Sequence, residues 1–147
     1  MREMQVHGLV LAQDSPGSTL ILREADGNRY LLLAIGPAEA QSIARGLHGD
    51  ELSRPLTHDL MCLVVEEMGS AMERVVIHEV KDNTFIGSLD LKTDFGVIEL
   101  DARPSDAVAM AVRTRVPIFC LDTVLDRQAI TQEDIERLRE EMNEENE

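Results

Sequence analysis

Two short segments of the chain carry the same kinds of residue in the same order. The first is Arg54-Pro55-Leu56-Thr57-His58-Asp59, and the second is Arg103-Pro104-Ser105-Asp106. In each, an arginine and a proline precede a hydroxyl side chain and an aspartate at the expected start of a helix. A guanidinium fork and the unpaired N–H groups of a helix start both favour anions. Together the segments indicate a site that could hold a phosphate.

Additional groups near these segments extend the chemistry. His58 is the one side chain in either segment that can give and take a proton near neutral pH. Mg²⁺ and Mn²⁺ prefer oxygen ligands, which carboxylates supply. Asp59, Asp106 and Glu39, the last in the first turn of its own expected helix, would form such a ligand set if the fold brought them together.

A purely structural interpretation of the same residues stays open. Ser, Thr and Asp near helix starts commonly cap the helix, and an Arg often pairs with such an Asp. For either segment alone, helix capping is the commoner use of these residues. The presence of two such segments brings the capping and phosphate-site interpretations closer together. The other histidines, His7, His48 and His78, show no partner spacing and are interpreted as structural. The chain has no P-loop, GxGxxG, HExxH, GxSxG or paired CxxC motif.

Strands and helices must position these residues. Apolar runs bounded by turn residues predict strands over 4–11, 19–23, 30–35, 72–80, 84–91, 97–100 and 118–121. Helical spacing and helix-start signals predict helices that begin at residue 37, cover 57–68 and 104–114, and begin again at residue 131. The chain thus divides into a strand-rich start, two helices, a second strand cluster, a third helix and an acidic tail.

Local patterns make these expectations specific. The apolar segment 30–35 predicts a central strand, and segment 57–68, apolar nearly all round, predicts the most buried helix. Asp26-Gly27 matches a two-residue hairpin turn in which Gly supplies a positive φ. Lys81-Asp82-Asn83 predicts a second hairpin, and Asp14-Ser15-Pro16-Gly17 predicts a turn.

Composition limits the classes of function. The 147 residues suit one domain, and 44% hydrophobic residues suffice for a core. An aromatic share of 3% makes an RNA-recognition sheet improbable, because such sheets stack bases on aromatic rings. A net charge of -14 disfavours non-specific duplex binding, since the surface repels phosphates.

Cysteine use and hydropathy indicate the compartment. Cys62 and Cys120 stand in apolar runs without CxxC spacing, so we expect buried, unpaired thiols. There is neither a signal-peptide pattern nor an apolar stretch of about 20 residues that would cross a bilayer. The expectation is a cytoplasmic protein that does not contact a membrane.

Longer blocks of the sequence resemble the bifunctional nuclease (DNase/RNase) domain family. They are Leu33 to Ala40, Arg54 to Leu60, Lys81 to Phe85, Asp101 to Ala111 and Val116 to Phe119, in that order. The resemblance covers about residues 4 to 127, so residues 1–127 are assigned to this domain and residues 128–147 to an acidic C-terminal helix and tail. Ala34, where the family commonly has Pro, and Asp82-Asn83, in place of Asp-Gly, depart from the pattern outside the candidate site.

The resemblance implies an α+β fold, with a mixed, largely antiparallel sheet packed against three to four helices. It also implies cleavage of DNA and RNA, as attributed to some members. The first hypothesis is therefore metal-assisted phosphodiester hydrolysis. Asp59, Asp106 and Glu39 would hold Mg²⁺ or Mn²⁺. Arg54 and Arg103 would stabilise the negative charge of the phosphorane-like transition state, and His58 would be the general base or acid. Ser105 is the fourth candidate catalytic residue. The substrate expected is single-stranded DNA or RNA.

The competing hypothesis is a non-catalytic interaction or anion-binding domain, in which the same residues cap helices or line an oligomer interface. Both hypotheses include a homo-oligomer, with a dimer favoured, because the expected helices are too few to cover the apolar strands.

Overall fold

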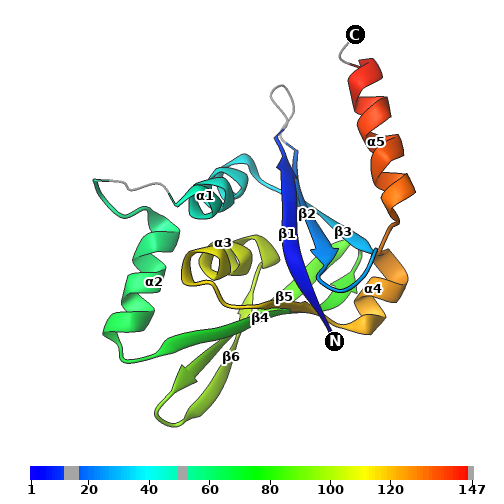
Figure 1. Cartoon of the computed structure of the whole chain (residues 1–147). Helices are drawn as coiled ribbons and strands as arrows, with labels where there is room; N and C mark the ends of the chain where they lie inside the picture. Colours follow the sequence, from blue (N-terminus) through cyan, green and yellow to red (C-terminus); the bar gives the residue numbers. More distant parts are fainter. Residues whose placement is uncertain (12–16, 50–52, 146–147) are drawn as a thin grey trace.

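A seven-stranded sheet organises the chain (Figure 1). The structure is a computed structural model that describes residues 1–11, 17–49 and 53–145. The strands are β1 (Arg2–Val10), β2 (Ser18–Glu24), β3 (Tyr30–Ile35), β4 (Ala71–Lys81), β5 (Thr84–Thr93), β6 (Gly96–Ala102) and β7 (Ile118–Cys120). The predicted turn at Asp14-Ser15-Pro16-Gly17 falls, except for Gly17, outside the described residues.

The strand order is β3-β2-β1-β7-β4-β5-β6. Two antiparallel meanders, β1–β3 and β4–β6, are joined by the short strand β7, which runs antiparallel to β1 and parallel to β4. All other neighbours are antiparallel. The α+β fold with a mixed, largely antiparallel sheet is therefore confirmed.

The two predicted hairpins have different outcomes. Asp82 and Asn83 link β4 to β5 with φ of 50° and 63°, as a tight primed turn requires. The two-residue turn predicted at Asp26-Gly27 is wrong, because five residues separate β2 from β3 and Gly27 has no positive φ. The Glu24 carboxylate accepts hydrogen bonds from the N–H and Nε of Arg29 and closes this longer loop.

Strand β3 is an edge strand, and its predicted central position is wrong. Its apolar residues are buried by packing on its faces and not by a second strand neighbour. Leu31 and Leu33 are buried in the main core. An isolated bridge from Tyr30 to Ile130 covers one end of the open edge. The apolar residues of this segment therefore predicted that the faces of β3 are buried, but they did not predict its position in the sheet.

Five helices are present in the described residues, one more than the upper expectation. They are α1 (Pro37–His48), α2 (Thr57–Glu67), α3 (Pro104–Thr114), α4 (Asp122–Gln128) and α5 (Gln132–Glu145). Figure 1 shows α1 and α2 flanking α3 on one side of the molecule. α3 is the most buried of them, with Val108, Met110 and three alanines at 1% exposure or less. The helix α4 had no clear sequence signal.

Helix α2 is largely exposed, so the prediction that 57–68 is the most buried helix is wrong. Its only buried residue is His58. Leu60, Leu63 and Val64 are 53%, 45% and 52% exposed and define what we call the α2 face. The apolar residues all round α2 are therefore not all covered by the core of this chain.

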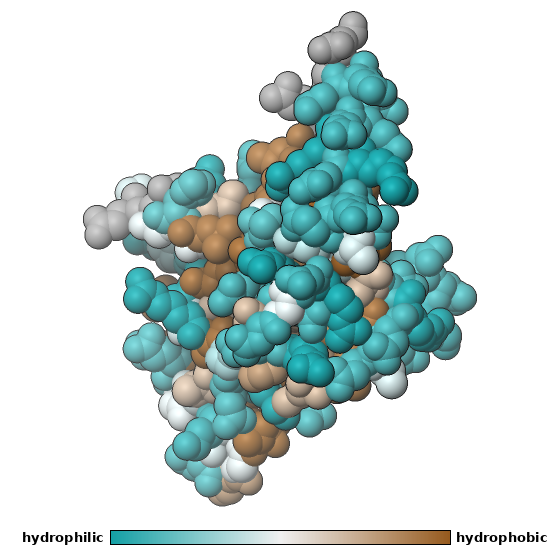
Figure 2. All heavy atoms as spheres, turned by 45° about the vertical axis from the view of Figure 1, so that its right-hand side comes forward, coloured by the Kyte–Doolittle hydropathy of each residue, from teal (hydrophilic) through white to brown (hydrophobic). Residues whose placement is uncertain are grey.

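Helix α5 begins as predicted, with the Asp134 carboxylate accepting from the N–H and the hydroxyl of Thr131. Ile135 is buried against Ile21 and Tyr30, whereas Leu138 is 41% exposed. The helix points away from the sheet in Figure 1, and its surface in Figure 2 is predominantly hydrophilic.

Both cysteines are unpaired, as expected, although Cys62 is only half-buried. Burial raises the pKa of both thiols, that of Cys120 to about 12. Among the described helices, none has the length and apolar character that a bilayer span requires.

Candidate functional site

The site forms where the first turns of α2 and α3 meet the side of α1. Pro104 at the first helical position of α3 and Thr57 at that of α2 fix the two starts. Gly46 allows α1 to approach α3 closely, because a Cβ there would lie 2.6 Å from Val112 Cγ2. This approach places Ser42, one turn earlier on α1, beside the two helix starts.

His58 is the buried centre of the site, at 8% exposure. Its Nε2 lies 2.9 Å from Asp106 Oδ1, and its Nδ1 lies 2.5 Å from Ser42 Oγ. The imidazole therefore connects α2 to both α1 and α3. Both ring nitrogens have a polar partner, which fixes the orientation of the ring.

Arg103 occupies the open side of the same carboxylate. Its Nε donates to Asp106 Oδ2 over 2.8 Å, and its terminal nitrogen donates to Glu39 Oε1 over 3.1 Å. Burial raises the pKa of the Asp106 carboxyl, but hydrogen bonds from Arg103 and His58 outweigh burial, so that pKa lies below its ordinary value. Asp106 is therefore ionised at neutral pH.

A second ion pair supports Ser42 from the other side. Arg113 Nε donates to Asp59 Oδ1 over 2.7 Å, and another guanidinium nitrogen donates to Ser42 Oγ over 3.2 Å. The other oxygen of Asp59 accepts from the N–H of Leu56. Burial raises the pKa of Asp59, but Arg113 and this N–H outweigh it, and the pKa lies below its ordinary value.

A pocket of about 910 Å³ opens over these residues. Ser42, His58, Arg103 and Asp106 contribute to its wall, as do Glu39, Arg45 and apolar residues of α2. Polar groups that converge in a largely apolar depression are typical of a ligand site.

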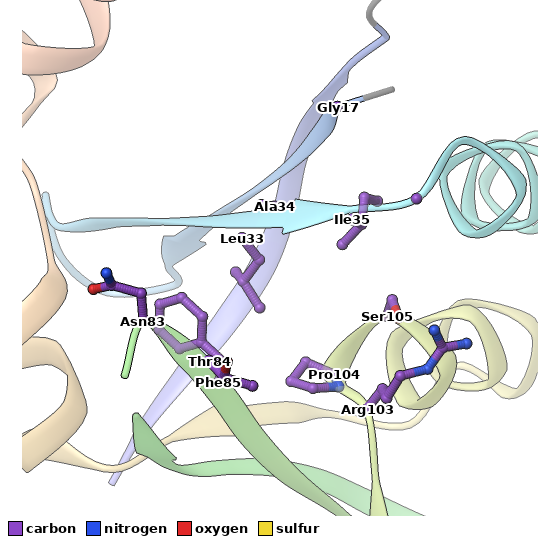
Figure 3. Close-up of a pocket in the computed structure, with 11 residues that line it drawn as sticks. Gly17, Leu33, Ala34, Ile35, Asn83, Thr84, Phe85, Arg103, Pro104 and Ser105 are labelled. Carbon is purple, nitrogen blue, oxygen red and sulfur yellow. The ribbon is translucent and has the colours of Figure 1, made fainter. Parts of the chain in front are cut away.

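Ser105 faces a different pocket of about 580 Å³ between β3, β5 and the start of α3 (Figure 3). Leu33, Phe85 and Pro104 line it together with Ser105, which is 7% exposed. Figure 3 shows the Arg103 side chain extending away from Leu33 and Phe85. Arg103 thus lines both this pocket and the one over His58, whereas Ser105 lines only this one.

The comparison with protein families supplies independent evidence. The model of the bifunctional nuclease domain matches residues 20–133, most of the chain. This chain belongs to the bifunctional nuclease domain family. The resemblance inferred from the sequence blocks is therefore confirmed.

Relatives of this family member include proteins with and without a functional name. The chain is 40% identical over 125 residues to an uncharacterized protein of Mycobacterium tuberculosis, covering 85% of this chain and 74% of that protein. It is 32% identical over 115 residues to Bifunctional nuclease 1 of Oryza sativa subsp. indica, covering 75% of this chain and 34% of the rice protein. Bifunctional nuclease 2 of Oryza sativa subsp. japonica is 29% identical over 119 residues. The chain spans about a third of either rice nuclease.

Within this bifunctional nuclease domain, the structure brings together four of the predicted site residues: Glu39, His58, Arg103 and Asp106. Asp59 joins them only through Arg113 and Ser42. Arg54 is exposed and makes no hydrogen bond or ion pair with the described residues.

Sequence reasoning missed Ser42 and Arg113. One signal for Ser42 was its position three residues after Glu39, since residues i and i+3 share a helix face. Arg113 has the appearance of an ordinary basic residue in the last turn of a helix, which complements the helix dipole.

The predicted metal ligands do not converge. Across residues 1–11, 17–49 and 53–145, no three His, Cys, Asp or Glu side chains are grouped as metal ligands. Asp106 faces His58 and Arg103, Asp59 faces Arg113, and Glu39 faces Arg103. Carboxylates paired in this way do not fit a divalent ion. Ligation of Mg²⁺ or Mn²⁺ by Asp59, Asp106 and Glu39 stays a prediction without geometric support.

Proposed function

We propose that this bifunctional nuclease domain hydrolyses phosphodiester bonds of single-stranded DNA or RNA. The observation that carries the proposal is His58, buried and aligned by the ionised Asp106 in the wall of an open pocket. A histidine positioned by a carboxylate is suited to proton transfer during attack on phosphorus. The names of the rice relatives support the same class of reaction.

Arginines in the pocket supply the charge that a phosphate requires. Arg103, with its side chain 66% exposed, and the exposed Arg45 both reach the pocket wall. A guanidinium beside the phosphate stabilises the negative charge that develops on its oxygens during attack. In this role Arg103 also keeps Asp106 ionised, so substrate binding and histidine alignment depend on one side chain.

The overall charge favours a single strand over a duplex. A net charge of -14 repels a dense phosphate backbone, and a single strand has a lower charge density than a duplex. Arg45 and Arg103 are the guanidinium groups of the pocket that would meet phosphates on this negative molecule. Binding should weaken as salt is added, with a shallow slope that reflects a small number of phosphate contacts.

The test compares site variants with matched variants outside the pocket. The substrates are end-labelled single-stranded DNA and RNA, and initial rates are measured with Mg²⁺, with Mn²⁺ and with EDTA. We expect His58→Ala and Asp106→Asn to lower the rate by about 100-fold or more, the scale of a positioned acid or base. His48→Ala and Asp94→Asn, on exposed residues, should cleave as the unmodified protein does.

Purified protein that cleaves neither substrate under any of these conditions would contradict the proposal. Equal cleavage by the site variants and the matched variants would contradict it as well, because it would trace the activity to a contaminant. Cleavage that requires Mg²⁺ or Mn²⁺ would add a divalent ion to the reaction and call for a ligand set.

The second candidate is a non-catalytic interaction domain. A specific observation favours it: the charges of Glu39, Asp59, Arg103, Asp106 and Arg113 are all paired within the site. Such pairing ties α1, α2 and α3 together without any substrate. In that case the site variants would lower the melting temperature and no cleavage would be observed with any form of the protein.

A further inference from the structure

Ser42 has surroundings that a helix-surface serine does not ordinarily have. Serine within a helix commonly bonds back to a carbonyl of the preceding turn. In the described residues, the polar partners of Ser42 Oγ are instead His58 Nδ1 on α2, at 2.5 Å, and the Arg113 guanidinium on α3, at 3.2 Å. The hydroxyl is therefore held by two other helices.

The hydrogen positions follow from the chemistry of the partners. Asp106 is ionised and can only accept, so His58 Nε2 must carry a proton and donate it. Arg113 can only donate, so Ser42 Oγ accepts from it. With neutral His58, the single hydroxyl proton of Ser42 then points at Nδ1. The result is a hydroxyl, an imidazole and a carboxylate connected in one line.

This line has the connectivity of the serine, histidine and aspartate triads of hydrolases, with the two ring nitrogens exchanged. Ser42 also lies in the wall of the 910 Å³ pocket, together with His58 and Arg103. Neither nitrogen of His58 is left for a water molecule, because Ser42 and Asp106 occupy both. The hydroxyl already in contact with the imidazole is thus the group best placed to attack.

We infer that Ser42 is the nucleophile of this site and forms a phosphoserine intermediate with the substrate. The inference rests on the proposed phosphodiester hydrolysis and adds a catalytic residue to it. In the first step, Ser42 Oγ forms a bond to phosphorus and the ester bond to one sugar oxygen breaks. The Oγ proton passes to His58 Nδ1 and then to that leaving oxygen, which departs as an alcohol.

In the second step, water attacks the same phosphorus, and His58 Nδ1 accepts a proton from that water. The bond from phosphorus to Oγ breaks, and His58 returns the proton to Oγ. The sum is one water consumed and one phosphodiester cleaved, with no change in oxidation state. Arg113 stabilises the charge on Oγ during both steps, and Arg103 is placed to stabilise the phosphate oxygens.

The primary test does not require nuclease activity. A fluorophosphonate probe loses fluoride to an activated serine and leaves a phosphonate ester of defined mass on it. We expect the full-length protein to be labelled on Ser42, identified by peptide mass spectrometry. Ser42→Ala should not be labelled at that peptide, and His58→Ala should be labelled at least 10-fold more slowly. Ser70→Ala, a matched variant at another half-buried serine, should be labelled at the normal rate.

A nuclease assay and a melting curve complete the test. Ser42→Ala should lose as much cleavage as His58→Ala, about 100-fold, while its melting curve stays cooperative. Labelling of Ser42 in a protein that cleaves no nucleic acid would uphold the nucleophile and overturn the nuclease. Absence of labelling, with cleavage by Ser42→Ala at the unmodified rate, would overturn the nucleophile and leave the nuclease in place.

Discussion

The starts of α2 and α3 use nearly the same residues for different purposes. Asp59 and Asp106 both stand at the third helical position. Asp59 accepts from the N–H of Leu56 before its own helix, as half of a capping box, and pairs with Arg113. Asp106 instead binds His58 of the other helix and its own neighbour Arg103.

The spacing between Arg and Asp explains the difference. Arg103 precedes Asp106 by three residues, so its guanidinium folds back onto the carboxylate. Arg54 precedes Asp59 by five residues, and it remains exposed. The comparison teaches that matching residue types predict a helix start reliably, whereas the exact spacing decides whether the preceding arginine reaches the aspartate of its own helix start.

The largest expected effect is on the nuclease rate, and it distinguishes Arg103 from Arg54. Arg103→Ala removes both the partner of Asp106 and a pocket charge, so the nuclease rate should fall by about 100-fold, the scale of a lost electrostatic contact at a reacting group. Arg54→Ala should lower the rate by no more than a few-fold. Initial rates on single-stranded RNA measure both. Equal losses would mean that the two segments act as a symmetric pair.

The next effect concerns the helices that follow these starts. Met110 of α3 is 1% exposed, and Met110→Ala should lower the free energy of unfolding by roughly 2–5 kcal/mol, as for other buried truncations. Leu63 of α2 is 45% exposed, so Leu63→Ala should lower the free energy of unfolding much less than Met110→Ala does in dilute protein. Urea unfolding measures both variants. A similar loss for Leu63→Ala would show that α2 is buried in solution.

The exposed α2 face leads to a prediction about assembly. Isolated exposed apolar residues are ordinary, but Leu60, Leu63 and Val64 are contiguous on one helix, and Val97 and Ile98 on β6 are exposed too. We expect a two-fold dimer at micromolar concentration. The double variant Leu60→Glu with Val64→Glu should sediment as a single chain. Sedimentation of the unmodified protein as a single chain would contradict the dimer.

The smallest effect is a pH dependence of stability. The pKa of Asp59 lies below its ordinary value of 3.8, because the hydrogen bonds from Arg113 and Leu56 outweigh burial. Its stabilising contribution is therefore complete above pH 3.8 and is lost as the pH falls through the folded-state pKa. Asp59→Asn should be less stable than the unmodified protein at pH 7, and this difference should shrink below pH 3.8. A constant difference in urea unfolding would show that Asp59 is not coupled to Arg113.

Local features of the fold were predictable, and long-range ones were not. The Asp82-Asn83 turn, Pro104 at a helix start and the box of Thr131 and Asp134 each depend on a few neighbouring residues. The edge position of β3 and the exposure of α2 depend on which distant segments pack against them.

The residues of the candidate site likewise include some that the sequence predicted and some that depend on long-range packing. Glu39, His58, Arg103 and Asp106 carried chemical signals in the sequence, and the fold brings them together. Ser42 and Arg113 are common residue types at unremarkable positions, and only the approach of α1 to α3 gives them a role. Spacing along the chain cannot predict a contact that depends on the close packing of two helices.

Strand β7 has a consequence for the order of folding. Its three residues pair with both β1 and β4, which do not pair with each other, so the two meanders can form separately but cannot merge without it. Arg2 meets Cys120 across most of the sequence, a contact that costs much loop entropy and forms slowly. A ribosome must therefore synthesise nearly the whole domain before the sheet can close, and until then both meanders have an unpaired edge that chaperones or other nascent chains can reach.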